Sequence, residues 1–356
     1  MKAILYAPPY TMTPEIVRLV ATISEIVGRF TATADVMITP RLRRENRIRS
    51  IQGSLAIEQN SLSLGQVTAV IQGRRVLGSP REIQEVRNAF AAYEALPSWS
   101  PVEMNDLLAA HRILVAGLVD EPGAFRRGGI GVFRDQQVLH VAPPVQRVPK
   151  LMADLLNWLK TTPEHSLIAG CIFHYELESI HPFADGNGRM GRLWQTLILS
   201  KWQPWLAFVP VESVIRERQE AYYQALRQSD QQAEATRFIV FMLEALRDAL
   251  AQLASDQASD HVTDQVRSFL RILSAGDMTL SEAMKKLSLA HRPTFRSNYV
   301  HPALKMGLVE MTQPAAPRSP TQRYHLTMKG RSVIEGLRMD RTSRIPSDSR
   351  AKNRTH

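Results

Sequence analysis

Apolar residues recur every three or four positions through most of the first 250 residues, the spacing of amphipathic helices. This pattern predicts helices at 16–26, 83–96, 104–115, 148–159, 167–180, 190–199 and 238–253. Between 128 and 141 the pattern changes to two short apolar runs around a polar turn at 134–137. That alternation predicts a β-hairpin. The fold class is therefore mainly α, with one hairpin inserted in a helical core.

The last third of the chain has a different organisation. Small polar residues at 252–262 predict a linker. Beyond it we expect helices at 263–273, 280–287 and 293–306, followed by short strands at 308–312 and 323–327. Three helices and a two-stranded ribbon form the outline of a small winged helix-turn-helix domain. The Arg-, Ser- and Asp-rich segment 339–356 predicts a disordered tail.

Composition excludes several classes of protein. The 356 residues are 44% hydrophobic and 22% charged, as in ordinary globular proteins with a sizeable core. No apolar run reaches the roughly 18 residues of a membrane helix, and prolines interrupt the N-terminus before a signal peptide can form. The single cysteine, Cys171, excludes a disulfide framework and a Cys-rich zinc site. We therefore expect a cytoplasmic protein without a membrane partner.

The net positive charge lies in the C-terminal segment. Residues 262–356 carry 17 Lys and Arg against 7 Asp and Glu, which accounts for the whole net charge of +10. The other 261 residues are neutral. A polyanionic partner would explain this asymmetry, and so would solubility.

The segment 180–194, IHPFADGNGRMGRLW, contains several side chains that can take part in catalysis or in phosphate binding. Apolar helical patterns on both sides predict a helix, a tight loop and a second helix, whose first amides form an anion-binding site. His181 can titrate near neutral pH. Asp185 offers an oxygen ligand for Mg²⁺, and Arg189 and Arg192 share one helix face. This set of residues suits phosphoryl or nucleotidyl transfer.

Residues 181–192, HPFADGNGRMGR, resemble the signature of Fic-domain proteins, HPFx(D/E)GNGRxxR, and weaker resemblance spans about residues 50–250. The resemblance implies a helical core with a hairpin flap that transfers AMP from ATP to hydroxyl side chains of target proteins. It divides the chain into an N-terminal helical region at 1–100, a Fic core at 101–251 with its flap at 129–142, and the winged-helix domain at 262–338.

The resemblance also implies roles for individual residues. His181 would take the proton from a target Ser, Thr or Tyr, whose oxygen attacks the α-phosphate and releases pyrophosphate. Asp185 would hold Mg²⁺. The predicted contacts to the ATP phosphates are Gly186, Asn187, Gly188, Arg189, Met190, Gly191 and Arg192.

A second motif lies ahead of the core, in a helix expected near 50–62. Ser54 and Glu58 match the family's inhibitory pattern (S/T)xxxE(G/N), although Gln59 stands where Gly or Asn is expected. The resemblance implies that Glu58 pairs with Arg192 and blocks the γ-phosphate, since carboxylate and phosphate compete for one guanidinium. In some relatives the same glutamate positions water to remove AMP. The plain alternative is an exposed helix residue.

Three further sets of residues are candidates for binding. Tyr222 and Tyr223 resemble the family's segment beside the adenine. The flap would pair its main chain with a target, and an ordinary stabilising hairpin is the alternative; its candidates are Ile130, Gly131, Val132, Val138, Leu139 and His140. In the winged helix, DNA contact and protein docking are equally open; the DNA candidates are Arg292, Arg296, Asn298 and Arg323.

The sequence thus predicts an autoinhibited protein adenylyltransferase that uses ATP and Mg²⁺ and modifies target proteins and itself. Two alternatives remain. The same site can transfer another nucleotide or phosphate group, or remove AMP. A different class is a DNA-binding regulator whose Fic core is a weakly active sensor. A homodimer is also open.

Overall fold

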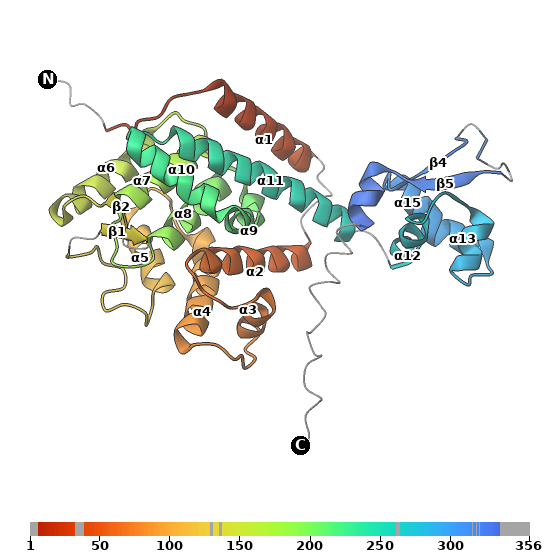
Figure 1. Ribbon diagram of the computed structural model, residues 1–356, viewed down its shortest axis with the longest axis horizontal. Coiled ribbons are helices and arrows are strands. Elements are labelled where there is room, and N and C mark those ends of the chain that lie inside the picture. Colours follow the sequence, from red (N-terminus) through yellow and green to blue (C-terminus); the bar gives the residue numbers. More distant parts are fainter. Residues whose placement is uncertain are drawn as a thin grey trace, which may run out of the picture. The chain divides into compact units, whose positions relative to one another are not determined.

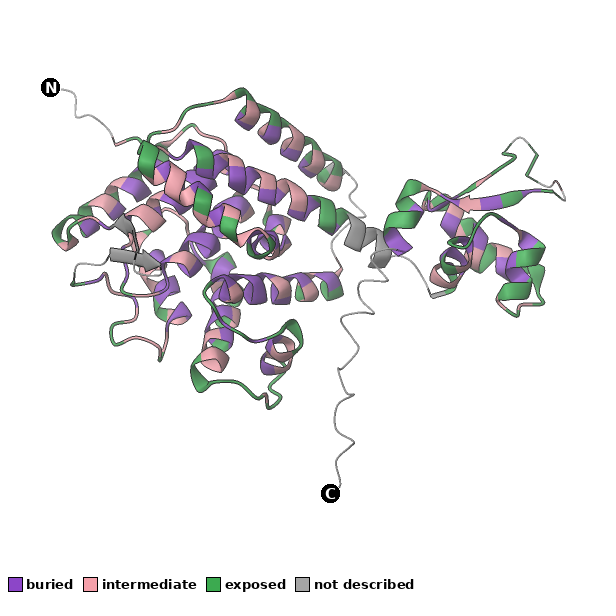
Figure 2. Cartoon of the chain, in the orientation of Figure 1, coloured by how far each residue is buried: buried purple, intermediate pink, exposed green. Residues whose placement is uncertain are grey.

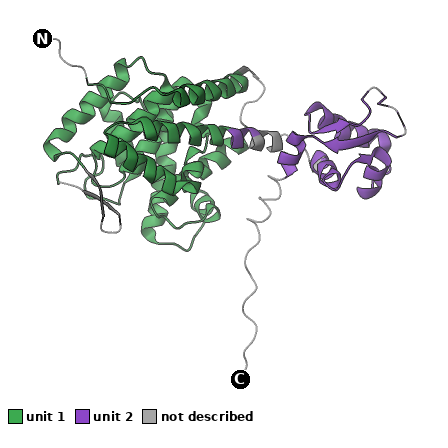
Figure 3. Ribbon diagram, turned by 45° about the horizontal axis from the view of Figure 1, so that its top comes forward, with its two compact units in different colours: residues 1–250 green, residues 251–356 purple. Residues whose placement is uncertain are grey.

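The computed structural model describes residues 6–32, 39–128, 131–134, 137–260, 264–314, 316–317, 319 and 321–334. The chain divides into two compact units, residues 1–250 and 251–356 (Figure 3). The predicted tail at 339–356 and the flap residue Ile130 lie outside the described residues. None of the helices in the described ranges combines the length and apolarity of a membrane span.

The first unit is built almost wholly of helices, as predicted (Figure 1). Short 3₁₀ turns η1 (Leu96–Ser98), η2 (Val145–Arg147) and η3 (Pro204–Phe208) connect some of them. The helices are α1 (Pro14–Ala32), α2 (Pro40–Ile57), α3 (Leu64–Ile71), α4 (Pro80–Ala95), α5 (Met104–Leu114), α6 (Val148–Thr161), α7 (Ser166–Ile180), α8 (Asn187–Trp202), α9 (Val211–Glu217), α10 (Gln219–Gln232) and α11 (Thr236–Asp260), of which residues 236–250 belong to this unit.

Two expectations about helix boundaries were wrong. The predicted linker is helical as far as Asp260, because its Ala, Gln and Leu favour helix and it contains neither Gly nor Pro. The helix expected near 50–62 begins at Pro40 and ends at Ile57. Glu58 is its first residue beyond the end, and Gln59 follows with a left-handed φ of 68°. Glycine and asparagine adopt that conformation most easily, which gives a physical reason for the family's preference at this position.

Helices α7 and α8 form the centre of the unit. Both are buried on most of their surface (Figure 2). The side chains of Phe173, Leu177 and Trp194 are at most 1% exposed. Their apolar residues therefore face neighbours on nearly every side, unlike those of a surface helix. The loop between the two helices is held at both ends by the best-packed elements of the unit.

The hairpin lies where the sequence predicts it, but Arg134 and Gln137, which were expected in the turn, are paired strand residues. Strand β1 (Gly131–Arg134) pairs antiparallel with β2 (Gln137–Val141), in a register that sets Gly131 opposite Val141. A bulge interrupts the pairing between Val132 and Phe133. Bulges of this kind bend a strand and are common beside binding sites.

The second unit contains helices α12 (Asp264–Leu273), α13 (Leu280–Lys286), α14 (Arg292–Phe295) and α15 (His301–Lys305), with a π-helical turn, η4 (Arg296–Val300), between the last two. Strands β3 (Met278–Thr279), β4 (Val309–Met311) and β5 (Arg323–Leu326) form an antiparallel sheet in the order β3-β5-β4. The sequence missed β3, since two residues are too short to show alternation. A core around Phe269, Phe295 and Tyr324 packs this unit independently.

Helix α2 is pressed against α9 without room for a side chain at the contact. A Cβ atom built on Gly53 would lie 2.8 Å from the carbonyl carbon of Glu212. Beside this contact, the Tyr93 hydroxyl donates to Glu212 at 2.6 Å, and Arg216 donates to Gln52 at 2.9 Å. The residues just before Glu58 are thus fixed to the core by close packing and by hydrogen bonds.

We predict opposite effects on stability for two glycine substitutions. Gly53→Ala should lower the free energy of unfolding by about 1–3 kcal/mol, because the added methyl group overpacks the α2–α9 contact. The matched control, Gly28→Ala in α1, places its methyl where the described residues leave open space. It should raise stability by about 0.5–1 kcal/mol. Urea denaturation of both variants measures the difference, and equal stabilities would contradict the close contact.

Candidate active site

The loop between α7 and α8 is rigid because its backbone adopts two left-handed turns and its side chains hold the main chain. His181 ends α7 with φ 49° and ψ 59°, and Gly186 precedes α8 with φ 87°. The Asn187 amide binds the main chain of Phe183 twice, accepting from its N–H and donating to its carbonyl, each at 2.9 Å. Phe183 itself is fully buried. The loop is thereby anchored at its middle as well as its ends.

The buried His111 packs against this loop. The ring of His111 stacks on Phe183, with centroids 3.7 Å apart. Its Nδ1 accepts from the Gly123 amide, so its Nε2 carries the proton and donates to the Asp185 carbonyl at 3.0 Å. Burial lowers the pKa of His111 to about 4, which keeps the ring neutral at physiological pH.

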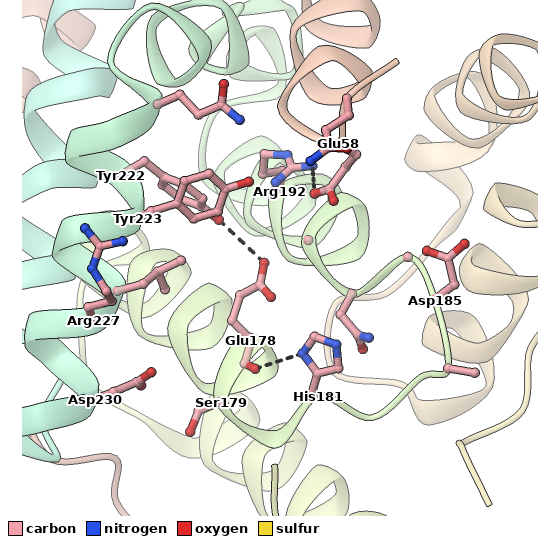
Figure 4. Close-up of a pocket in the computed structure, with 17 residues that line it drawn as sticks. Glu58, Glu178, Ser179, His181, Asp185, Arg192, Tyr222, Tyr223, Arg227 and Asp230 are labelled. Atoms are coloured by element: carbon pink, nitrogen blue, oxygen red, sulfur yellow. Dashed lines mark hydrogen bonds and ion pairs between the residues drawn. The ribbon is translucent and has the colours of Figure 1, made fainter. Parts of the chain in front are cut away.

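The loop opens onto a pocket of about 380 Å³ (Figure 4). The pocket is lined on one side by the motif and on the other by α10 and the end of α2. Its motif residues are His181, Ala184, Asp185, Gly186, Asn187, Gly188 and Arg192, and its other residues are Glu58, Gln59, Glu178, Ser179, Gln219, Tyr222, Tyr223, Leu226, Arg227 and Asp230. The first amides of α8 lie at its edge, where the helix dipole favours an anion.

His181 lies at the pocket with one ring nitrogen committed to the main chain. Its Nδ1 is 3.3 Å from the Glu178 carbonyl, an acceptor, so this nitrogen bears the proton (Figure 4). The basic nitrogen of that tautomer is Nε2. The arrangement suits a general base, whose orientation is set by the hydrogen bond on its other side.

Arg192 is almost completely buried and is bound by both residues of the N-terminal motif. Its Nη2 donates to Glu58 Oε1 at 2.7 Å and to the Ser54 carbonyl at 3.1 Å. Its Nε donates to Ser54 Oγ at 3.1 Å. Burial by itself would lower the pKa of Arg192, but the nearby Glu58 carboxylate raises it, so the guanidinium stays charged. The structure thus brings together three residues that lie up to 138 positions apart.

The carboxylate of Glu58 lies over Gly188, at the entrance to the amides of α8. A Cβ atom at position 188 would collide with Glu58 Oε1. The Glu58 side chain is 39% exposed, whereas that of Arg192 is only 2% exposed. Glu58 therefore lies on the pocket side of the ion pair, whereas Arg192 is enclosed by the protein core.

The end of α2 is held in place by the opposite wall. Gln219 and Tyr223 of α10 both donate to the Ile57 carbonyl, at 2.9 and 3.3 Å. Asn60 is buried and donates to Glu85 at 2.8 Å. These contacts fix the direction of the helix end from which Glu58 points into the pocket.

A second acid, Glu178, shares the pocket with Glu58. Burial and the charge of Glu58 raise the pKa of Glu178 to about 7. The Tyr222 hydroxyl lies 3.5 Å from its Oε1 (Figure 4). Because Glu58 and Glu178 both lie near the Arg192 guanidinium, the charge on either carboxylate changes the pKa of the other.

Asp185 faces the pocket while both of its oxygens are bound by arginines. Arg189 donates to Oδ1 and Arg81 to Oδ2, each at 2.9 Å. The Arg189 side chain is 5% exposed, and that of Arg81 is 57% exposed. The described residues hold no cluster of three or more His, Cys, Asp or Glu suited to a metal. Asp185 thus presents one carboxylate at the pocket, held by a buried arginine on one oxygen and by an exposed arginine on the other.

The two tyrosines have different positions. Tyr222 is 1% exposed, its ring packs against Phe238 and Phe241, and its hydroxyl lies 3.2 Å from His174. Tyr223 is less buried. Both contribute to the pocket wall.

Other predicted residues lie away from the pocket lining. Met190 is fully buried in the core, and Gly191 gives space to the His174 ring. Arg189 reaches Asp185 but does not line the cavity. Of the flap candidates, Gly131, Val132, Val138, Leu139 and His140 have described backbone only, in β1 and β2.

The C-terminal candidates belong to the second unit. Arg292 and Asn298 are exposed and Arg296 is half-buried, all on the segment from α14 to η4. Arg323 is exposed but donates to the Asp277 carbonyl and to Glu282. Their contact with DNA remains a prediction.

Sequence reasoning missed several residues of the pocket. Leu226, Arg227 and Asp230 follow Tyr223 by three, four and seven positions, and that helical spacing was a usable signal. Glu178 lies one turn before His181. Arg81 and His111 gave no local signal, because they reach the loop only through the tertiary fold.

Comparison with known proteins agrees with this geometry. Residues 101–199 match the model of the Fic/DOC family. Residues 264–327 match a second family model, whose description is "Filamentation induced by cAMP protein Fic-like, C-terminal domain". A crystal structure of a Fic family protein from Desulfovibrio desulfuricans G20 is 62% identical, with a TM-score of 0.69, and the match covers 91% of this chain and 99% of that one.

More distant relatives are named for an activity. The protein adenylyltransferase fic-1 of Caenorhabditis briggsae is 31% identical over 58% of this chain and 41% of its own length. The protein adenylyltransferase Fic of Aedes aegypti is 30% identical over 54% of this chain and 38% of its own length. The chain thus spans about two fifths of these curated relatives. The near-complete match to the bacterial structure and the intact loop motif together show that the chain belongs to the Fic family.

Proposed function

We propose that the chain is a protein adenylyltransferase that transfers AMP from ATP to hydroxyl side chains of target proteins and of itself. The observation that carries the proposal is one pocket that combines His181, the Asp185 carboxylate, the first amides of α8 and the buried Arg192. These are the groups needed to bind a triphosphate and to activate an alcohol. The names of the curated relatives support this activity.

The transfer step needs one proton acceptor and stabilisation of negative charge. The target hydroxyl gives its proton to His181 Nε2 as its oxygen forms a bond to the α-phosphorus. The bond from that phosphorus to the bridging oxygen of the β-phosphate breaks, and pyrophosphate leaves. The amides at 186–188 and the Arg192 guanidinium bind phosphate oxygens, and such donors contribute most when they are held in place beforehand. The rigid loop supplies that condition.

Asp185 is the residue that would hold Mg²⁺. Magnesium is bound in many nucleotide sites by one or two carboxylates together with substrate phosphates, so the partly exposed Asp185 carboxylate beside the first amides of α8 fits this role. The ion supplies positive charge to the phosphates when it is bound. Asp185 retains lone pairs beyond those used by Arg189, whose buried guanidinium holds the carboxylate in one orientation.

Glu58 acts as an inhibitor in this proposal. Its carboxylate occupies Arg192 Nη2 and covers Gly188, so a terminal phosphate and Glu58 exclude each other from the same donors. Tyr223, on the α10 wall, is the more exposed tyrosine and the candidate for contact with adenine. The hairpin is the proposed docking edge for a target segment, which pairs main chain to main chain.

Removing the inhibitory carboxylate should increase transfer. We predict that Glu58→Gly incorporates at least tenfold more label from α-labelled ATP into itself or lysate proteins than the unmodified chain. Glu58→Gln should give an intermediate gain, since it keeps size but not charge. Glu45→Gln, a control within α2, should have no effect. Equal incorporation by all variants would remove the inhibitory role, and label from γ-labelled ATP would indicate phosphorylation instead.

Removing the base should abolish transfer but spare binding. In the Glu58→Gly background, His181→Ala should lower the transfer rate by about 10²–10⁴-fold, the usual contribution of a positioned base. Nucleotide affinity, measured by calorimetry, should change less than threefold. His301→Ala in the second unit serves as the control. A His181→Ala variant that retains full transfer would contradict the assignment.

Arg81 should compete with a cation for Asp185. We predict that Arg81→Gln tightens binding of Mn²⁺, used as a spectroscopic substitute for Mg²⁺, about two- to fivefold in the presence of ATP. That range corresponds to loss of one exposed ion pair. Electron paramagnetic resonance of free Mn²⁺ measures it without relying on activity. Arg87→Gln, an exposed arginine further along α4, is the control, and equal affinities in both variants would count against cation binding at Asp185.

A further inference from the structure

Arg126 is a buried cation whose partners, within the described residues, are all main-chain carbonyl groups. The residue is 4% exposed. Its Nε donates to the carbonyl of His181 at 2.7 Å, its Nη1 to that of Gly128 at 2.9 Å and its Nη2 to that of Pro143 at 2.5 Å. Its own amide donates to the Pro182 carbonyl at 2.9 Å. A guanidinium carries its donors in a fixed planar fork, so it can hold several segments in one geometry.

These carbonyls belong to segments with distinct roles in the proposed function. Gly128 lies shortly before β1, and Pro143 lies two residues after the end of β2. His181 begins the motif loop. The Arg126 side chain therefore links the segments just before and just after the hairpin to the backbone of the proposed base, His181.

The backbone of His181 needs such support. Its left-handed conformation is strained for a residue with a side chain. The Leu177 carbonyl accepts its amide at 2.9 Å, and Arg126 donates to its carbonyl. Because the direction of a side chain follows from the backbone torsions, these two bonds also set where the imidazole points. Without Arg126, the His181 carbonyl would lose its charged donor, and the strained turn would lose one of the hydrogen bonds that restrain it.

We propose that Arg126 is a positioning residue for transfer, which fixes the separation between the target-docking hairpin and the imidazole of His181. A hydroxyl presented by a target paired with the hairpin then arrives at the base in a constant geometry. This inference rests on the proposed function. Arg126 does not line the nucleotide pocket, so its loss should affect transfer to an acceptor far more than binding of ATP.

The test uses three variants of the full chain in the Glu58→Gly background. Arg126→Lys keeps the charge but cannot reach several carbonyls with one ammonium group. Arg126→Gln removes the charge. Arg127→Gln is the matched control, because the neighbouring Arg127 side chain is 81% exposed and pairs with Glu121. The acceptor is the His181→Ala chain, the donor is α-labelled ATP, and kcat, the KM for acceptor and the Kd for ATP are measured separately.

We expect Arg126→Lys to bind ATP within twofold of its parent while its kcat falls at least tenfold and its KM for acceptor rises. Arg126→Gln should lose more, and Arg127→Gln should match the parent. The ring signals of His181 in nuclear magnetic resonance spectra should shift in Arg126→Lys and stay unchanged in the control, a change that general loss of stability would not produce.

Two results would overturn the inference. One is an Arg126→Lys variant with a lower melting temperature but unchanged kcat, KM and His181 signals. The other is loss of ATP binding together with turnover, which would mean that the pocket itself had collapsed. Failure of the proposed function looks different, because the Glu58→Gly parent would then bind ATP but transfer no label to any acceptor.

Discussion

A buried arginine that requires an anion is the constraint on which the rest of this site depends. Arg192 is surrounded by the core of the N-terminal unit, and removing an arginine from water is costly unless a negative group compensates it. In the structure that group is Glu58, assisted by the hydroxyl and carbonyl of Ser54. A terminal phosphate offers the same charge and the same acceptor geometry. In the proposed function, inhibition and substrate binding are therefore two ways to pair the same buried cation with a negative group.

This view explains why the supporting structure is so rigid. Helix α2 is fixed to α9 at Gly53, and its end is held by Gln219, Tyr223 and Asn60. The simplest way to break the Glu58–Arg192 ion pair is then rotation of the half-exposed Glu58 side chain, while helix α2 stays in place. Glu178 lies close by, and it is protonated more easily than an ordinary glutamate, so it adds little negative charge below neutral pH. In the proposed function, Glu58 is then the dominant competitor of a phosphate for Arg192 below neutral pH.

Much of the fold was readable from the sequence, because most core helices carry a clear three-to-four-residue period and the hairpin alternates. The exceptions have physical causes. The segment 252–262 has the polarity of a linker, yet its residues favour helix and are helical as far as Asp260. Strand β3 is too short to show a pattern. The residues that lie close in sequence, from His181 to Arg192, were found by their motif. Arg81, His111 and Arg126 reach the loop from other helices and turns, so no local pattern could reveal them.

The claim that Glu58 and a terminal phosphate compete for Arg192 is tested most directly by crystal structures with a non-hydrolysable ATP analogue. One structure would contain the unmodified chain and the other the Glu58→Gly variant. The account predicts that the γ-phosphate contacts Arg192 in the variant and is turned away from it in the unmodified chain. A γ-phosphate bound to Arg192 in both structures, with the Glu58–Arg192 ion pair intact, would contradict it.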